Sequence, residues 1–339
     1  MKILFIGGTG NISSEISNLI LERGKDELVL LNRGGAKNKD LPKGARFLTG
    51  DIHDEAAIKK LIANESFDVV ADFIAFTPDH VERDYRLFKG KTKQYIFISS
   101  ASAYQKPQAL VPITESTPLV NPYWQYSRDK IACEDFLMKM VREEGFPATI
   151  IRPSHTYGDF MLPLPIAGWP TLKRMIEGKQ VIIHGDGTSL WTLTHSKDFA
   201  RAFVGLMGNV HTIGDAINIT GDEWLTWNQI FKIYADILGV KLNAVHVSSD
   251  FLVATSSEDL EGPLCGDMMN NVIFDNAKLK KLIPGFAADI AFSEGIKMPI
   301  KNHLNNVDLQ IENPAFDRWC DAVIAAQETA IESVRKALL

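Results

Sequence analysis

Cysteine is scarce in this 339-residue sequence. Only Cys133, Cys265 and Cys320 are present, far apart, without a Cys-x-x-Cys pair or a histidine at metal-ligand spacing. This pattern excludes a disulfide framework and indicates no zinc site, so we predict reduced, structural thiols and no bound metal.

Excess positive charge and long apolar runs are also missing. The 36 basic residues are outnumbered by 42 acidic ones, giving a formal charge of -6, which provides no general attraction to nucleic acid or to an anionic membrane. No apolar run reaches the roughly eighteen residues of a membrane span, and "MKILFIGGTG" is too short for a signal peptide. We expect a soluble, cytoplasmic protein without nucleic-acid or membrane partners.

What the first half does contain is an alternation of short apolar runs with amphipathic stretches. The apolar runs lack a period of two, as expected of parallel strands covered by helices on both faces. They are "KILFI", "ELVLL", "ARFLTG", "DVVADFI", "QYIFIS" and "ATIIRP". The pattern predicts an α/β fold with a doubly wound, parallel Rossmann-type sheet.

The composition of the sequence changes after Pro153, where proline and glycine become frequent and strand candidates become fewer. We assign residues 1–160 and 191–222 to the dinucleotide-binding domain, since "DFARAFVGLM" and "AINIT" return to it as a helix and a strand. Residues 161–190 and 223–339 are then a smaller, C-terminal, substrate-binding α/β part. Its polar stretch "SSDFLVATSSEDLEG" is interpreted as a linker, and residues 315–339 as a helix.

A glycine-rich loop joins the first predicted strand to a helix. Gly7 permits a tight turn, and Gly10 lets a pyrophosphate approach the backbone and the positive end of the helix. Ser13 stands where a third glycine often eases helix packing. We expect the loop to bind a dinucleotide, with Thr9, Asn11 and Ile12 as further contacts.

The end of the second predicted strand bears on which dinucleotide is bound. An acidic side chain there would bind the ribose 2′-hydroxyl of NAD, but the sequence has Asn32 and Arg33. Asn32 removes the carboxylate that would repel a 2′-phosphate, and Arg33 offers a guanidinium to hold one. NADP(H) is therefore favoured over NAD(H).

Tyr126 and Lys130 are four residues apart, which stacks them on one face of a helix. Spacing alone is weak evidence, because Tyr85 and Lys89 share it. A lysine one turn away would favour the phenolate of Tyr126, a general base for hydride transfer, and the serine at the end of the strand "QYIFIS" could orient the substrate oxygen.

Five motifs in order decide between the two pairs. "GGTGNIS", "FISSASAY", "ESTPLVNPYWQYSRDK", "RPSHTYGD" and "GDGTSLWTLTHSKDFARA" resemble the landmarks of the extended short-chain dehydrogenase/reductases, the NAD(P)-dependent epimerase/dehydratase group. The resemblance implies hydride-transfer chemistry on a small-molecule substrate, and a homodimer paired through the tyrosine helix. Tyr85 and Lys89 match nothing in it.

By this resemblance the site residues fall into two groups. The implied catalytic residues are Ser100, Tyr126 and Lys130. The implied cofactor contacts are Asp51 and Ile52 at the adenine, the loop residues Phe73, Ile74 and Ala75, and Tyr126, Lys130 and Pro153.

Departures from the family pattern concern the substrate. His155 stands where nucleotide-sugar enzymes usually have an asparagine, and Trp191 where they usually have an arginine that grips the diphosphate. An indole offers a flat apolar face and one N–H donor instead of an anion clamp. Ala101 and Ser102 replace the Asp-Glu pair of sugar dehydratases, which argues against dehydration; Ser102, His155 and Trp191 are therefore the predicted substrate contacts.

These observations predict an NAD(P)-dependent epimerase or oxidoreductase acting on a sugar or sugar-like alcohol or ketone. A tryptophan in this region could instead be core, and His155 could be structural. Two alternatives stay open: a nucleotide-sugar 4-epimerase, and a non-catalytic NADP-sensing regulator or RNA-associated protein on the same fold.

Overall fold

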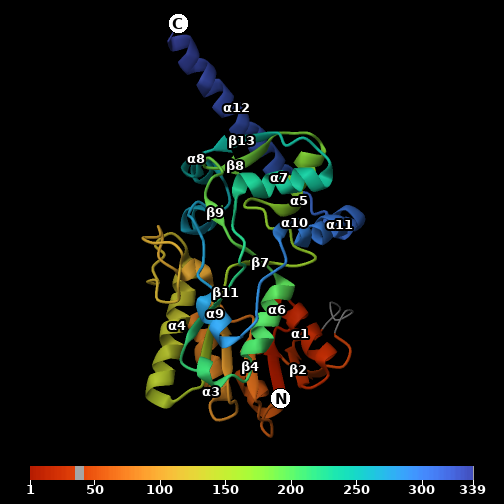
Figure 1. Ribbon diagram of the computed structural model, residues 1–339, viewed down its shortest axis with the longest axis vertical. Coiled ribbons are helices and arrows are strands. Elements are labelled where there is room, and N and C mark those ends of the chain that lie inside the picture. Colours follow the sequence, from red (N-terminus) through yellow and green to blue (C-terminus); the bar gives the residue numbers. More distant parts are fainter. Residues whose placement is uncertain (35–41, 339) are drawn as a thin grey trace.

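A seven-stranded parallel sheet organises the lower part of the molecule in the computed structural model, which describes residues 1–34 and 42–338 (Figure 1). The strand order is β11-β6-β5-β4-β1-β2-β3. The strands are β1 (Lys2–Ile6), β2 (Glu27–Asn32), β3 (Arg46–Thr49), β4 (Val69–Asp72), β5 (Tyr95–Ile98), β6 (Ala148–Pro153) and β11 (Ala216–Ile219). The predicted doubly wound α/β fold is confirmed.

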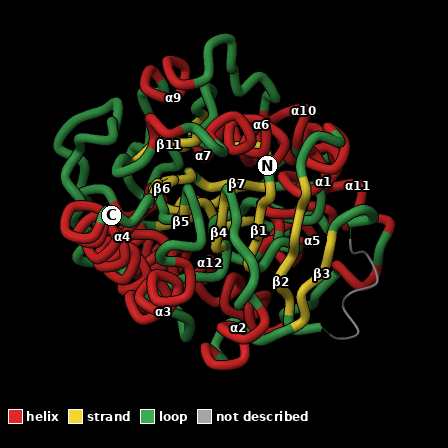
Figure 2. Tube along the Cα trace, turned by 90° about the horizontal axis from the view of Figure 1, so that it is seen from below, coloured by secondary structure: helices red, strands yellow, loops and turns green. Residues whose placement is uncertain are grey.

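Helices cover both faces of this sheet (Figure 2). They are α1 (Asn11–Arg23), α6 (Ser196–Leu206) and α9 (Ala277–Leu282) on one face, and α2 (Glu55–Leu61), α3 (Pro78–Phe88) and α4 (Gln125–Glu144) on the other. Side chains of successive strand residues therefore enter two separate apolar clusters. This double burial explains why the strands lack a polar alternation.

The order of strands reverses between β1 and β4, because the chain runs outward through β2 and β3 before returning. In open sheets of this type, ligands bind beyond the carboxyl ends of the strands at this reversal. The glycine loop after β1 and the loop after β4 therefore border the expected ligand position.

A second part of the molecule, with an apolar core of its own, lies above the sheet (Figure 1). Three two-stranded pairings contribute to it: β10 with β7, β12 with β9, and β13 with β8. Its strands are β7 (His155–Tyr157), β8 (Val181–His184), β9 (Leu190–Trp191), β10 (Leu193–His195), β12 (Leu225–Thr226) and β13 (Ala244–Val247). Its α-helices are α5 (Gly168–Ile176), α7 (Trp227–Leu238), α8 (Ser249–Thr255), α10 (Phe292–Gly295), α11 (Lys297–Asn305) and α12 (Pro314–Ala337).

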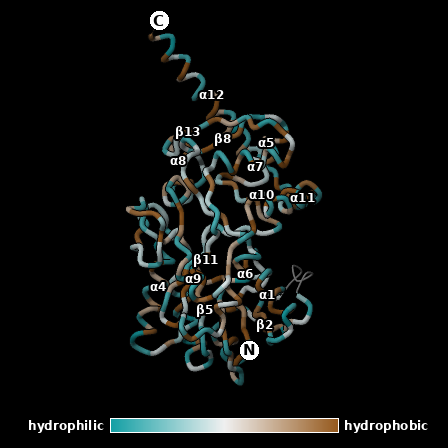
Figure 3. The backbone as a smooth tube through the Cα atoms, in the orientation of Figure 1, coloured by the Kyte–Doolittle hydropathy of each residue, from teal (hydrophilic) through white to brown (hydrophobic). Residues whose placement is uncertain are grey.

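Single turns of 3-10 helix are η2 (Ala101–Ala103), η3 (Val210–Thr212) and η5 (Val307–Leu309), and η4 (Glu261–Met268) is a π-helix. Apolar residues occur both in the sheet and in the upper part, and the far end of α12 leaves the body of the molecule (Figure 3). The boundaries proposed for the two domains stay a prediction. Among the described residues, no helix is both long and apolar enough to cross a membrane.

The linker prediction for the stretch after Val247 was wrong. α8 fills its first half, with the Ser248 hydroxyl accepting the Phe251 N–H and Leu252 fully buried, and η4 begins at Glu261. The polar residues cap and cover these helices instead of separating domains. The helical tail is confirmed as α12; Leu339 lies outside the described residues.

Candidate functional site

In the glycine loop after β1, the backbone packs directly against side chains of neighbouring elements. Gly7 adopts φ +77°, and a Cβ there would lie 2.5 Å from Cγ2 of Ile74 on the loop after β4. Gly8 is similarly tight against Leu30. Only glycine fits such positions without displacing a neighbour.

Ser13, which replaces the usual third glycine, closes the loop on itself. Its hydroxyl donates to the Gly7 carbonyl (2.9 Å) and accepts the Gly10 N–H (2.8 Å). The side chain is buried. The serine therefore stabilises the turn in a way that a glycine could not.

A cavity of about 530 Å³ lies beyond the carboxyl ends of β1, β2 and β3. Asn32 borders it, and the Asn32 side-chain amide nitrogen is buried without a hydrogen-bond partner among residues 1–34 and 42–338. An unsatisfied buried donor is costly unless a ligand accepts from it. The cavity therefore fits the ribose side of a dinucleotide. Predicted cofactor residues that line it are Gly7, Thr9, Asn32, Arg33, Asp51, Ile52 and Ile74.

The remaining predicted cofactor residues have other surroundings. Ile12, Tyr126 and Pro153 line a second cavity, described below. Asn11 donates to the carbonyl of Thr156. Gly10 gives its N–H to Ser13, Phe73 packs edge-on against Phe5 in the core, and Ala75 accepts a hydrogen bond from Lys130.

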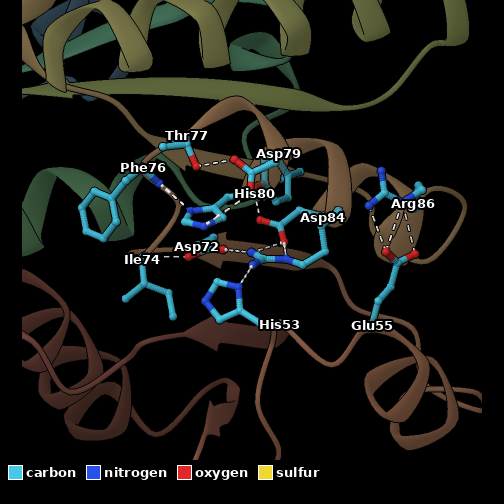
Figure 4. Close-up of polar contacts among 12 residues, drawn as sticks. His53, Glu55, Asp72, Ile74, Phe76, Thr77, Asp79, His80, Asp84 and Arg86 are labelled. Carbon is cyan, nitrogen blue, oxygen red and sulfur yellow. Dashed lines mark hydrogen bonds and ion pairs between the residues drawn. The ribbon is translucent and has the colours of Figure 1, made fainter. Parts of the chain in front are cut away.

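Sequence reasoning missed two histidines at the first cavity. His53 and His80 both line it, with ring centroids 5.1 Å apart. The Nδ1 atom of His80 accepts the N–H of Phe76, which holds the loop after β4 (Figure 4). Neither belongs to a motif, although His53 directly follows the predicted adenine contacts, which was an available signal.

A buried ion cluster supports the same loop. Asp72 at the end of β4 accepts the Ile74 N–H (2.6 Å) and a hydrogen bond from Arg83 (3.0 Å), which also bonds Asp84 (2.7 Å). Asp72 and Asp84 lie side by side (Figure 4). Burial, followed by the neighbouring carboxyl of Asp84, raises the pKa of Asp72 well above its ordinary value. The cluster therefore fixes the position of the loop after β4.

The predicted catalytic residues meet at the start of α4. Ser100 precedes η2, and its Oγ lies 2.8 Å from Oγ of Ser102, which accepts a hydrogen bond from Ser127 (2.8 Å). Tyr126 lies in the first turn of α4 and is hydrogen-bonded to Ser100. The start of η2 and the first turn of α4 therefore bring the serine and tyrosine hydroxyls together.

Lys130 lies one turn further along α4 and is almost completely buried. Its Nζ donates to the carbonyls of Ala75 and Ile98, both at 2.7 Å, and lies 5.6 Å from the centre of the Tyr126 ring. Burial lowers the pKa of Lys130 to about 8. The lysine thereby links α4 to the cofactor loop.

The expectation that Lys130 lowers the pKa of Tyr126 was wrong for the protein alone. Burial raises the pKa of Tyr126, the hydrogen bond with Ser100 opposes this increase, and the carboxylate of Asp267 adds to it. The physical reason is that the ammonium group of Lys130 is directed at two carbonyl oxygens. In the protein alone, burial therefore favours the neutral phenol of Tyr126.

A buried ion pair holds α4 in place. Glu134, one turn after Lys130, accepts from Arg152 of β6 (3.0 Å from Nε to Oε1) and from the Ser99 hydroxyl at the end of β5. Arg152 also donates to the Tyr104 hydroxyl (2.9 Å). These contacts connect the catalytic helix to the two strands beneath it.

The second cavity, of about 310 Å³, contains the predicted catalytic and substrate residues. Its lining consists of Ile12, Ser100, Ala101, Ser102, Trp124, Tyr126, Pro153, Ser154, His155, Trp191, Asp267, Met268 and Val272. No lysine or arginine is among these residues, and burial lowers the pKa of His155, which favours its neutral form. The cavity therefore offers an anionic ligand no cationic partner.

Trp124 and Trp191 border this cavity, whereas Trp169 does not. Trp191 belongs both to the cavity wall and to the upper core, and only 2% of it is exposed. Trp124 lines the cavity beside Tyr126, with ring centroids 5.1 Å apart. Trp169 stacks on His303 in the core and does not border the cavity.

Comparison with protein-family models gives one match that spans most of the chain. Residues 3–220 match the model of the NAD dependent epimerase/dehydratase family. The chain belongs to this family. The matched part contains the glycine loop, Ser100, Tyr126, Lys130, His155 and Trp191.

Relatives of this epimerase/dehydratase family member include a stem-loop binding protein and a UDP-glucose 4-epimerase. The chloroplast stem-loop binding protein of 41 kDa b of Arabidopsis thaliana is 28% identical over 246 residues, which are 69% of this chain and 62% of that protein. The UDP-glucose 4-epimerase of Lactobacillus helveticus is 33% identical over 171 residues, 45% of this chain and 51% of that enzyme. The matches thus span about half to three fifths of these relatives.

Solved structures of epimerases and dehydratases have the same fold. The UDP-glucuronic acid 4-epimerase of Bacillus cereus, in complex with UDP-glucuronic acid and NAD, has a TM-score of 0.72 at 20% identity, covering 90% of this chain and 99% of that one. The dTDP-glucose 4,6-dehydratase of Bacillus anthracis, in complex with NAD, also has a TM-score of 0.72 at 18% identity, covering 91% and 98%. These likenesses concern the fold.

Proposed function

We propose that this chain is an NAD(P)-dependent epimerase or oxidoreductase acting on a sugar or sugar-like alcohol or ketone that carries no nucleotide. The observation that carries the proposal is that Ser100 and Tyr126 face a cavity that also contains His155 and Trp191 but no lysine or arginine. Family membership supports the hydride chemistry, which the bound nicotinamide supplies.

In this proposal each catalytic side chain has one task. Tyr126 takes or returns the hydroxyl proton at the reacting carbon, and Ser100 orients the reacting oxygen by a hydrogen bond. Lys130 holds the ribose and the cofactor loop. Because burial raises the pKa of Tyr126, the positive charge of an oxidised nicotinamide has to favour its ionisation.

We further propose that NADP(H) is preferred to NAD(H). The exposed Arg33 and the unpartnered Asn32 amide lie at the first cavity, where the ribose would bind, and both are donors suited to a 2′-phosphate. Asp51, at the same cavity, would accept from the adenine amino group.

The experiment for the function is a substrate screen with NADP(H) and NAD(H), comparing free sugars, glycosides and polyols with UDP-glucose and UDP-glucuronic acid. We expect turnover with an uncharged substrate, lost on Tyr126→Phe. Turnover restricted to the nucleotide sugars would favour the 4-epimerase alternative, which the Lactobacillus relative supports.

A second candidate is RNA association, favoured by the similarity to the stem-loop binding protein of Arabidopsis thaliana. The net charge of -6 and the presence of both Tyr126 and Lys130 weigh against it. Titration of a labelled stem-loop RNA at physiological salt separates the two: saturable binding together with failure of the substrate screen would favour the RNA-associated protein.

We also propose a homodimer paired through α4. Ala132 and Phe136 lie four residues apart on this helix and are only half-buried, so they present apolar surface on the outer side of α3 and α4. Pairing there would lie behind the catalytic turn and would not obstruct either cavity.

A further inference from the structure

One wall of the second cavity comes from a part of the chain that no sequence motif identified. The π-helix η4 contributes Asp267 and Met268 to the lining, and Val272 follows it. π-Helical turns are rare and occur frequently at functional sites. Asp267 is the one carboxylate among the lining residues.

η4 is fixed against the segment that precedes α4 by close packing and hydrogen bonds. A Cβ on Gly262 would lie 2.3 Å from Cδ1 of Trp124, so the indole packs directly on the helix backbone. The side-chain amide of Asn121 donates both to the Ser102 carbonyl (2.8 Å) and to the Gly266 carbonyl (2.7 Å). The position of Asp267 relative to Ser102 and Tyr126 is thereby defined.

Asp267 forms an ion pair with a lysine that has no access to solvent. Oδ1 of Asp267 accepts from Nζ of Lys106 at 2.9 Å, the Lys106 side chain is 0% exposed, and that of Asp267 is 17% exposed. A buried ammonium group needs such a partner. Since Lys106 balances its charge, Asp267 is suited to accept from a neutral hydroxyl, and an ammonium ligand would have to compete with the lysine.

Two further polar atoms at this cavity lack partners. Nε2 of His155 and Nε1 of Trp191 are buried without a hydrogen bond among the described residues. The indole can only donate, whereas the neutral imidazole carries one donor and one acceptor nitrogen. Together with the second oxygen of Asp267, they form a set of donors and acceptors that adjacent hydroxyl groups would satisfy.

We propose that Asp267 is a substrate-binding residue that accepts a hydrogen bond from a ring hydroxyl and selects neutral polyhydroxy substrates over nucleoside-diphosphate sugars. This inference rests on the proposed function, because it assumes that Ser100 and Tyr126 react with a ligand in the same cavity. Because the charge of Lys106 is already paired with Asp267 and no lysine or arginine is among the described residues that line the cavity, this wall offers a diphosphate no free cation. The flat faces of Trp124 and Trp191 cover the apolar side of a ring.

The test is ligand binding to the NADP-loaded enzyme, measured by calorimetry. The probes are methyl glucoside, methyl galactoside, methyl mannoside, myo-inositol, the monodeoxy analogues of the methyl glycosides, and UDP-glucose. Asp267→Asn alone would leave Lys106 buried without its counter-charge, so the Lys106→Met/Asp267→Asn double variant removes both charges together. Glu258→Gln, exposed and just before η4, is the control.

We expect at least one neutral probe to bind more tightly than UDP-glucose, and the double variant to weaken it by about tenfold or more, the usual effect of losing a hydrogen bond to a charged group. One deoxy analogue should bind poorly to the wild type but show no further loss in the double variant. A purely structural role for Asp267 would weaken all analogues alike.

Tighter binding of UDP-glucose, unchanged binding by the double variant, or no binding of any neutral probe would each overturn the proposal. Failure of the proposed function has a different signature. In that case the neutral probe binds in an Asp267-dependent manner, but no probe is turned over by a reaction that Tyr126→Phe abolishes.

Discussion

At the scale of single residues, burial determines how the catalytic side chains titrate. Tyr126 and Lys130 are both held largely out of water, which raises the pKa of the phenol and lowers that of the amine. Burial thus favours the neutral form of each group in the protein alone. In the proposed mechanism, the charge of the cofactor would therefore act together with Lys130 to favour ionisation of Tyr126.

Lys130 gives a prediction for stability. Its pKa is about 8 in the folded protein against an ordinary value of 10.5, so between these values the unfolded chain binds more protons and stability rises with pH. The free energy of unfolding of the wild type, relative to Lys130→Met, should increase by up to about 3 kcal/mol between about pH 7 and pH 11. Urea unfolding of both proteins without cofactor measures this difference; a pH-independent difference would contradict the burial of a charged Lys130.

Arg33 gives a prediction for the cofactor. Arg33→Ala should weaken NADPH binding about tenfold, as expected for the loss of a charge-assisted contact, and leave NADH binding unchanged. Fluorescence titration of both cofactors measures it, with Arg23→Ala, in the last turn of α1, as control. Tighter binding of NADH than NADPH, unaffected by Arg33→Ala, would contradict the NADP assignment.

At the scale of elements, the strands could be predicted from the sequence because their signal is local. Each of the seven strands of the main sheet was visible as an apolar run, and Gly7 was visible as the turn after the first of them. The contribution of η4 to the second cavity could not be predicted from the sequence. Asp267 contacts Lys106, and Gly262 contacts Trp124, across more than a hundred residues of chain. Such contacts leave no periodicity in the sequence.

The same reason explains the errors at single positions. The polar residues after Val247 indicate a linker when only the local sequence is considered. In the structure, Leu252 is buried in the core and Ser248 caps a helix. The effect expected of Lys130 on Tyr126 followed from helical spacing, which does not reveal that Ala75 and Ile98 offer their carbonyls to the ammonium group.

The packing of η4 on Trp124 gives a prediction for this element. Gly262→Ala would force a methyl group into the Trp124 ring, which itself packs beside Tyr126. We expect a loss of about 1–3 kcal/mol in the free energy of unfolding and a lower kcat with unchanged cofactor affinity. Glu261→Ala, exposed on the same helix, is the control. Wild-type stability and turnover in Gly262→Ala would show that η4 does not support the site.

At the scale of the whole molecule, the two cavities are formed by different regions of the fold. The sheet presents the first cavity at its carboxyl edge, and the upper part closes the second cavity with β9 and η4. In the proposed function, this arrangement separates cofactor recognition from substrate recognition. The proposal therefore places the difference from nucleotide-sugar relatives in the upper part and keeps the nucleotide-binding pattern in the sheet.

Assembly gives a prediction at this scale. If two copies pair through α4, Ala132→Arg should place a charge in the interface and convert the dimer to a monomer, because burying an unpaired charge is costly. Light scattering coupled to gel filtration measures the mass, with Lys139→Ala, exposed on the same helix, as control. A wild-type monomer, or a dimer unaffected by Ala132→Arg, would contradict pairing through this helix.

The most direct test of the central claim is a single-turnover experiment on the enzyme loaded with NADP⁺. The formation of reduced nicotinamide is followed by its fluorescence after mixing with the uncharged sugars and polyols, for the wild type and for Tyr126→Phe. The proposed mechanism predicts hydride transfer in the wild type, slowed by about 10²–10⁴-fold in the variant while cofactor binding is retained. Equal rates in the two proteins, or reduction only with nucleotide sugars, would contradict it.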